Sequence, residues 1–251
     1  MQLARTARTT LVTGASRGLG AAIAIEQGAV GNNVAVNYFN SAEGAERVCA
    51  RIREAGGYAH AFKADVRDEA EIDRMVGEIE TVFGGVDVLV ANATGPQPFL
   101  SIEQQTWQSY LDQLEFFLKS PLLLLQRVLP GMRARGFGRI IQIGSEVMEL
   151  GNPRFANYVA AKGAQLGQTR SWARELGPDG ITVNLVAPGW IPVERHAGAP
   201  QAELDAYRRG VPMQQMGKPE DIAKMVAYLA SDGAGFVTGQ KFAVNGGNTL
   251  C

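Results

Sequence analysis

The sequence predicts an α/β fold, a doubly wound parallel sheet of about seven strands with helices on both faces. Short apolar, β-branched runs alternate with longer helix-like segments along the whole chain, and this alternation is typical of a parallel sheet between two helical layers. The chain has 251 residues, 46% of them hydrophobic, which is enough for a large core. No repeat, low-complexity tract or linker interrupts the pattern, so we expect one domain over residues 1–251.

The element boundaries follow from the periodicity and from helix-start signals. Asp68 and Glu71 resemble a capping box for the third helix, and Pro219 suits the first turn of the last one. The expected strands are the β-branched runs at 10–13, 33–37, 58–63, 86–92, 139–144, 182–187 and 241–244. The expected helices lie near 19–30, 42–55, 69–83, 107–133, 155–176 and 219–230.

Charge and cysteine content exclude several classes of function. The formal net charge is −1, with 24 basic and 25 acidic residues and no basic block, which argues against nucleic acid or an anionic membrane as a partner. No stretch approaches the roughly 18 apolar residues of a membrane span. Cys49 and Cys251 have no metal or redox spacing, and the opening MQLARTARTT lacks the apolar region of an export signal. We therefore expect a cytoplasmic protein without a metal site.

A glycine cluster follows the first expected strand. Gly14, Gly18 and Gly20 in TGASRGLG have the spacing G-x-x-x-G-x-G and lead into an Ala- and Ile-rich helix. Glycine allows a tight turn and a close approach of the backbone, and a helix N-terminus offers unpaired N–H groups to a pyrophosphate. A plain strand-to-helix turn is the alternative, but the position between strand and helix favours a dinucleotide site.

Tyr158 and Lys162 in YVAAK form a candidate acid/base pair. Residues four apart share one helical face, so the ammonium of Lys162 can lie near the phenol of Tyr158 and lower its pKa. Bringing that pKa from ~10 to ~7 needs about 4 kcal/mol. Ser145 could then hold a substrate oxygen while Tyr158 exchanges its proton. Alone, the pattern would indicate an ordinary surface pair on a helix. The dinucleotide motif in the same chain favours a catalytic role for the two residues.

Five motifs occur in the order and spacing of the short-chain dehydrogenase/reductase family: TGASRGLG, ANATG, Ser145, YVAAK and APG. The resemblance extends from Thr9 to the terminal VNGGN. The segments RIIQIGS, NPRFANYVAAKGA and GITVNLVAPGWI are most similar to the 3-oxoacyl-[acyl-carrier-protein] reductase branch. The resemblance implies a Rossmann-type fold, an oxidoreductase that reduces a carbonyl to an alcohol, and a homodimer or homotetramer.

The resemblance also implies the roles of individual residues. Tyr158 would be the acid/base, Ser145 would hydrogen-bond the same substrate oxygen, and Lys162 would bind the nicotinamide ribose and lower the pKa of Tyr158. The residues expected to bind the cofactor are Gly14, Ser16, Arg17, Gly18, Leu19, Gly20, Asn37, Asp65, Val66, Asn92, Ala93, Pro188, Gly189 and Ile191.

The end of the second expected strand favours NADP(H) over NAD(H). NAD sites usually place an acidic residue there for the ribose hydroxyls, and such a residue repels a 2′-phosphate. Residues 37–42 contain no carboxylate, and the planar fork of Arg17 in the glycine loop could pair with a phosphate. A solvated loop arginine is the alternative.

Two positions depart from the family pattern. Phe117 stands where the family usually has a proton-relay asparagine, and its ring can neither donate nor accept a hydrogen bond. Val193 stands where many relatives have a threonine that contacts the carboxamide. The alternative function is therefore a cofactor-binding sensor or partner subunit with weak or lost catalysis. The intact Ser145, Tyr158 and Lys162 favour the enzyme.

Apolar side chains near the expected site suit a mostly apolar ligand with one carbonyl, although each could instead be a core or subunit contact. The helix near 107–133 is apolar nearly all round, which predicts a second subunit or helix against it. The expected substrate-binding residues are Phe99, Met148, Phe155 and Trp190.

Overall fold

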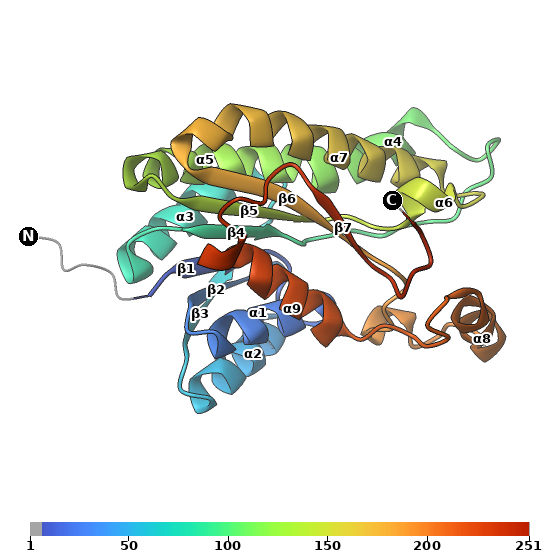
Figure 1. Cartoon of the computed structure of the whole chain (residues 1–251), viewed down its shortest axis with the longest axis horizontal. Coiled ribbons are helices and arrows are strands. Elements are labelled where there is room, and N and C mark those ends of the chain that lie inside the picture. Colours follow the sequence, from blue (N-terminus) through green and yellow to red (C-terminus); the bar gives the residue numbers. More distant parts are fainter. Residues whose placement is uncertain (1–6, 251) are drawn as a thin grey trace, which may run out of the picture.

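Seven parallel strands form one sheet in the order β3-β2-β1-β4-β5-β6-β7 (Figure 1). The computed structural model describes residues 7–250, apart from the side chain of Arg195, so the expectations for the first six residues and for Cys251 lie outside the described residues. The predicted doubly wound α/β fold is confirmed, and every predicted strand is present with ends that differ by at most two residues. The strands are β1 Thr9–Val12, β2 Asn33–Tyr38, β3 Tyr58–Lys63, β4 Val88–Ala91, β5 Gly138–Ile143, β6 Ile181–Pro188 and β7 Lys241–Val244.

Three long helices cover each face of the sheet (Figure 1). One face packs against α1 (Gly18–Ala29), α2 (Ala42–Glu54) and α9 (Pro219–Ala230), and the other packs against α3 (Glu69–Phe83), α5 (Ser120–Arg135) and α7 (Ala156–Leu176). Central strands are apolar on both sides because both faces are covered: all eight residues of β6 are buried. Burying one such aliphatic side chain contributes roughly 1.5–3 kcal/mol, so the two cores hold the layers together.

The predicted single helix near 107–133 is wrong in detail. It consists of α4 (Trp107–Leu114), a π-helical turn η1 (Glu115–Lys119) and α5, which ends at Gly136 in the left-handed conformation with φ 61°. The sequence also did not predict two short helices, α6 (Val147–Leu150) and α8 (Gln201–Gly210). Three short 3-10 turns complete the described elements: η2 Gly177–Asp179, η3 Glu194–His196 and η4 Asp232–Ala234.

The start of α3 forms only half of the predicted capping box. The carboxylate of Asp68 accepts a hydrogen bond from Glu71 N at 3.0 Å, as a cap should. The Glu71 carboxylate, however, accepts from Asp65 N at 2.7 Å and does not return to the Asp68 backbone. It therefore fixes the loop between β3 and α3. Pro219 begins α9 as predicted.

The return of the chain from β3 to β4 creates a switch point in the strand order, between β1 and β4. The chain runs outward from β1 through β2 to β3, then returns to β4 on the other side of β1. In parallel α/β sheets a ligand binds beyond the carboxyl ends of the strands at such a point. The segments that follow β1, β2, β4, β5 and β6 all reach this edge.

Candidate active site

The glycine loop joins β1 to α1 at the switch point. Gly14 has φ 62° and Gly18 has φ 56°, which is the left-handed region that favours glycine. A Cβ atom added at Gly20 would lie 2.4 Å from Gly14 O and 2.6 Å from Asn92 Nδ2, so only glycine fits there. The sequence thus places each glycine where the loop turns or packs, and leaves a cradle of backbone before α1.

Two asparagine side chains fix this cradle from neighbouring strands. Asn37, only 2% exposed, accepts from Gly14 N at 3.1 Å through Oδ1 and donates to Ala64 O at 3.1 Å through Nδ2. Asn92 Nδ2 donates to Thr13 O at 2.9 Å, and the backbone N–H groups of Asn92 and Ala93 donate to Thr13 Oγ1. The Asn37 side chain therefore holds the loop from inside and does not face solvent.

The other residues predicted to bind the cofactor near the glycine loop differ in exposure and in hydrogen-bond partners. Arg17 is exposed at the N-terminal end of α1, and Ser16 and Leu19 are half-buried next to it. Asp65 forms an ion pair with Arg67 at 2.6 Å, and this hydrogen-bonded guanidinium lowers the pKa of Asp65 below its ordinary value. Val66 is buried in the core beside α3.

The loop after β6 closes the opposite end of the cradle. Gly189 N donates to Val244 O at 3.1 Å, and a Cβ at Gly189 would lie 2.5 Å from the Tyr207 hydroxyl. Ile191 is anchored in the core at 6% exposure. The loop then returns to the glycine loop, because a Cβ at Gly18 would lie 3.5 Å from Val193 Cβ. Pro188, the last residue of β6, is buried.

Lys162 lies beneath Tyr158 in the interior of the site. Its Nζ donates to Ile143 O at 2.6 Å, at the end of β5, and to Gln165 Oε1 at 3.1 Å. The same Nζ is 5.6 Å from the ring centroid of Tyr158. Ser145 follows Ile143 by two residues, and its Oγ accepts from Val147 N at 3.4 Å. The structure thus brings the ammonium and the phenol together on one face of α7, beside the loop that carries Ser145.

Phe117 fills the space between these groups from the π-helical turn η1. Its ring is 3% exposed and meets Tyr158 edge-on, with centroids 5.4 Å apart. Lys162 Nζ lies 3.6 Å from the Phe117 ring centroid, well within the range of a cation–π contact. Phe117, which stands in place of the relay asparagine, therefore contacts both the Tyr158 ring and the Lys162 ammonium with its aromatic ring.

The predicted substrate-binding residues fall into two groups. Phe99, 62% exposed, stacks on Phe155 with centroids 4.3 Å apart, and Phe155 packs on Tyr158 at 4.7 Å. Met148 is half-buried on α6. Trp190 lies in a separate hollow of roughly 240 Å³ with Ile191 and Tyr207, edge-on to the Tyr207 ring at 5.5 Å. The four residues therefore do not line one pocket.

A family model described as "Enoyl-(Acyl carrier protein) reductase" matches residues 14–249. The chain is 41% identical over 242 residues to the 3-oxoacyl-[acyl-carrier-protein] reductase FabG of Staphylococcus aureus, covering 96% of this chain and 97% of that protein. It is 38% identical over 240 residues to the FabG of Pseudomonas aeruginosa, covering 96% of each chain. The chain is a short-chain dehydrogenase/reductase.

Solved structures agree with this membership. A mutant of a short-chain dehydrogenase/reductase from Serratia marcescens superposes with a TM-score of 0.88 at 35% identity, covering 97% of this chain and 98% of that one. A gluconate 5-dehydrogenase from Burkholderia cenocepacia, in complex with NADP and tartrate, gives 0.89 at 30% identity, covering 96% and 94%. This short-chain dehydrogenase/reductase is therefore an oxidoreductase that acts on CH–OH or C=O groups with a nicotinamide cofactor. The alternative of a non-catalytic sensor or partner subunit is not favoured.

Sequence reasoning missed a buried network beside Ser145 in this short-chain dehydrogenase/reductase. Glu146, 3% exposed, accepts from the Tyr207 hydroxyl at 2.6 Å and from Asn245 Nδ2 at 3.0 Å. The Tyr207 hydroxyl also accepts from Trp190 N at 2.8 Å. Burial and the Glu146 carboxylate raise the pKa of Tyr207 well above its ordinary value, so its hydroxyl stays a donor. An acidic residue next to Ser145 was the only signal in the sequence.

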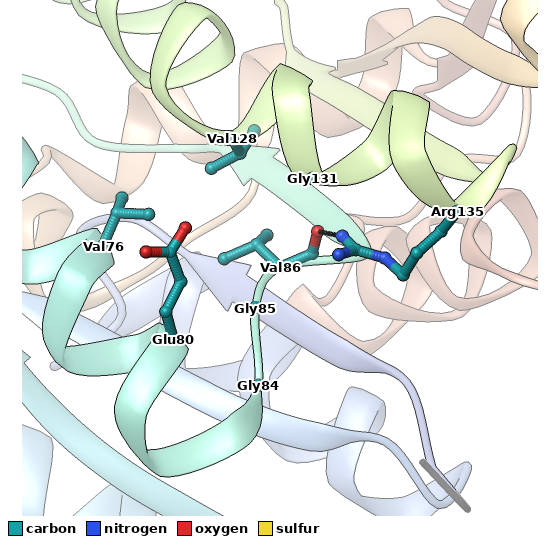
Figure 2. Close-up of a pocket in the computed structure, with 8 residues that line it drawn as sticks. All are labelled: Val76, Glu80, Gly84, Gly85, Val86, Val128, Gly131 and Arg135. Carbon is teal, nitrogen blue, oxygen red and sulfur yellow. Dashed lines mark hydrogen bonds between the residues drawn. The ribbon is translucent and has the colours of Figure 1, made fainter. Parts of the chain in front are cut away.

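A second hollow, of roughly 280 Å³, is lined by α3, α5 and the segment that enters β4 (Figure 2). It thus lies at the amino end of β4, and none of the catalytic residues lines it. Its charged groups already have partners: Glu80 binds Arg127 through two hydrogen bonds of 2.9 Å, and Arg135 donates to Val86 O at 2.6 Å. No ligand chemistry is assigned to it. Within residues 7–250, no helix has the length and apolar character to span a bilayer, and the same residues contain no group of three potential metal ligands.

Proposed function

We propose that this short-chain dehydrogenase/reductase reduces a ketone to an alcohol with NADPH, and that 3-oxoacyl thioesters are its leading substrate class. The observation that carries the chemistry is the Lys162 ammonium buried 5.6 Å from the Tyr158 ring centroid, next to the loop that carries Ser145. A buried cation beside a phenol favours the phenolate and suits an acid/base. The substrate class is supported by the 38–41% identity to relatives named 3-oxoacyl-[acyl-carrier-protein] reductases.

The catalytic side chains have separate roles in this proposal. Tyr158 gives its proton to the carbonyl oxygen during reduction, Ser145 donates a hydrogen bond to the same oxygen, and Lys162 stabilises the phenolate that remains. The nicotinamide supplies the hydride when it is bound. Phe99 and Phe155 form an aromatic surface beside Tyr158, against which the apolar part of a substrate would pack.

The glycine loop and the residues around it would bind the cofactor. Backbone N–H groups of the loop from Gly14 to Gly20 would hold the pyrophosphate, because this loop leads into the N-terminus of α1 and packs too closely at Gly20 for any side chain. Asn37 and Asn92 act as positioning residues, because their side-chain amides hydrogen-bond to the backbone of the glycine loop at Gly14 N and Thr13 O. We also propose cofactor contacts from Ser16, Leu19, Asp65, Val66, Ala93, Pro188, Gly189 and Ile191.

The proposed function is tested by NADPH oxidation at 340 nm against a panel of carbonyl compounds. The panel contains a 3-oxoacyl thioester such as acetoacetyl-coenzyme A, simple ketones, quinones and keto-sugar acids, because relatives are named after both thioester and gluconate substrates. Preferential turnover of the thioester supports the proposal. Turnover confined to the keto-sugar acids would move the enzyme to the gluconate class.

Replacing Arg17 by alanine should weaken NADPH binding about 10–100-fold, the range expected for a lost charge-assisted hydrogen bond. NADH binding should change by less than about threefold, because NADH lacks the 2′-phosphate. Arg17 is exposed in the glycine loop, so its removal leaves the core intact. Fluorescence titration with both cofactors measures the two losses. Equal losses, or a wild-type preference for NADH, would contradict the NADP(H) proposal.

We propose a homodimer or homotetramer that contacts through α4, η1 and α5. Within one chain this segment buries Phe117 and Leu124 but leaves Leu122 38% exposed and Phe116 half-buried. Light scattering at micromolar concentration should give a multiple of the 26.9 kDa chain mass. A mass near that of one chain would contradict the assembly. The single domain over residues 1–251 and the cytoplasmic location also stay predictions.

A further inference from the structure

A row of polar side chains is buried between β5 and α7, behind the catalytic pair. Lys162, Gln165, Thr169 and Gln142 are each at most 3% exposed. Lys162 Nζ donates to Gln165 Oε1, the Thr169 hydroxyl donates to Gln165 O at 2.9 Å, and Gln142 Nε2 donates to Thr169 Oγ1 at 3.1 Å. Buried polar groups cost free energy even when paired, and an apolar core would serve stability better. The row therefore calls for an explanation in terms of function.

The surroundings of Lys162 supply that explanation. A lysine ammonium has three donors on a flexible four-carbon stem, so one acceptor alone leaves it free to rotate. Ile143 O provides one fixed acceptor at 2.6 Å, and Gln165 Oε1 provides a second at 3.1 Å. The Phe117 ring attracts the charge from 3.6 Å but offers no directional acceptor. The amide of Gln165 thus adds directional control that the aromatic residue at position 117 does not.

We propose that Gln165 is a positioning residue that holds the Lys162 ammonium at its place beside Tyr158. The inference rests on the roles proposed above for Tyr158 and Lys162. Gln165 is 1% exposed and lies one helical turn beyond Lys162, away from the substrate, so it acts only through the lysine. Its loss should make the ammonium less well placed and the Tyr158 phenol harder to ionise.

The variant Gln165→Met tests this, because methionine keeps the length of the side chain but removes the strong acceptor. With acetoacetyl-coenzyme A and NADPH, kcat should fall about 10-fold or more, as expected for a lost hydrogen bond to a charged group. KM should stay within a few-fold, and the alkaline limb of the kcat–pH profile, where Tyr158 loses the proton it must donate, should move up by about one pH unit. Gln27→Met is the matched control: Gln27 is also a buried helical glutamine, in α1, its Oε1 accepts from Thr10 Oγ1 at 3.1 Å and from Asn32 Nδ2 at 2.8 Å, and the change should leave kcat and the profile unchanged.

A second readout needs no turnover. The phenolate absorbance near 295 nm, taken as the difference between wild type and Tyr158→Phe, reports the ionisation of Tyr158 as pH rises, and Gln165→Met should move it upward. Gln165→Glu is the second variant if methionine prevents folding. It places a carboxylate about 3 Å from Nζ, offsets the ammonium charge and should move the ionisation the same way.

Three outcomes are distinguished. A folded Gln165→Met protein with unchanged kcat, pH profile and Tyr158 ionisation would overturn the inference, as would equal losses in Gln165→Met and Gln27→Met. Near-normal turnover in Tyr158→Phe would instead overturn the proposed function. Loss of turnover in Tyr158→Phe together with a displaced profile in Gln165→Met alone supports both.

Discussion

Replacing Tyr158 by phenylalanine should lower kcat by about 10²–10⁴-fold, the usual contribution of a positioned acid/base. Only the hydroxyl is lost. The ring stays packed against Phe155 at 4.7 Å and Phe117 at 5.4 Å, so folding and NADPH affinity should change little. The expected pattern is therefore a loss in kcat with cofactor binding within a few-fold.

The measurement is steady-state turnover of the best substrate from the carbonyl panel, with NADPH titration and thermal unfolding alongside. Tyr110→Phe is the matched control, because it deletes a hydroxyl that donates to Gln105 Oε1 at 2.7 Å on α4. That variant should keep near-normal turnover. If Tyr158→Phe does so as well, the proton donor is another group and the mechanism proposed for this site is wrong.

Replacing Gly20 by alanine should weaken NADPH binding by about 10–100-fold, because overpacking a rigid site typically costs about 1–3 kcal/mol. The added methyl carbon would lie 2.4 Å from Gly14 O and 2.6 Å from Asn92 Nδ2. Neither atom can move without displacing the loop or the hydrogen bond from Asn92 to Thr13. The melting temperature should fall together with the affinity.

Gly77→Ala provides the control for Gly20→Ala. Gly77 is also helical, in α3, and a Cβ there would meet nothing within 4 Å. Alanine favours a helix over glycine by about 1 kcal/mol, so this variant should be as stable as wild type or more so, with unchanged NADPH binding. Isothermal titration and thermal unfolding compare the two variants. Unchanged cofactor affinity in Gly20→Ala would show that the cradle is not where the pyrophosphate binds.

The sequence predicted the layers of the fold because the strands are short β-branched runs between clear helical patterns. It could not predict the π-helical turn at Glu115–Lys119, since EFFLK reads as ordinary helix. The turn depends on tertiary contacts: Phe117 packs beneath Lys162, and Leu118 O accepts from Gln168 Nε2 at 3.3 Å. Such contacts override local propensity.

In the site, too, contacts between residues close in sequence could be predicted, and contacts between distant residues could not. The spacing of Tyr158 and Lys162 within one helix was sufficient to predict that they meet. The bond from Tyr207 to Glu146 joins residues 61 positions apart, and no local pattern encodes it. The same limit applies to Asn37, whose position near the end of β2 indicated a cofactor contact but whose amide hydrogen-bonds to Gly14 N and Ala64 O.

The Tyr207 hydroxyl links α8 to the loop that carries Ser145. α8 has no buried residue, yet this one group ties it to Glu146 and to the backbone of Trp190. The exposed positions of α8 are thus free to vary without disturbing the serine loop, provided that Tyr207 is kept. A library confined to those positions would therefore change the surface of α8 while kcat and the melting temperature stay close to those of the parent, as long as Tyr207 is present.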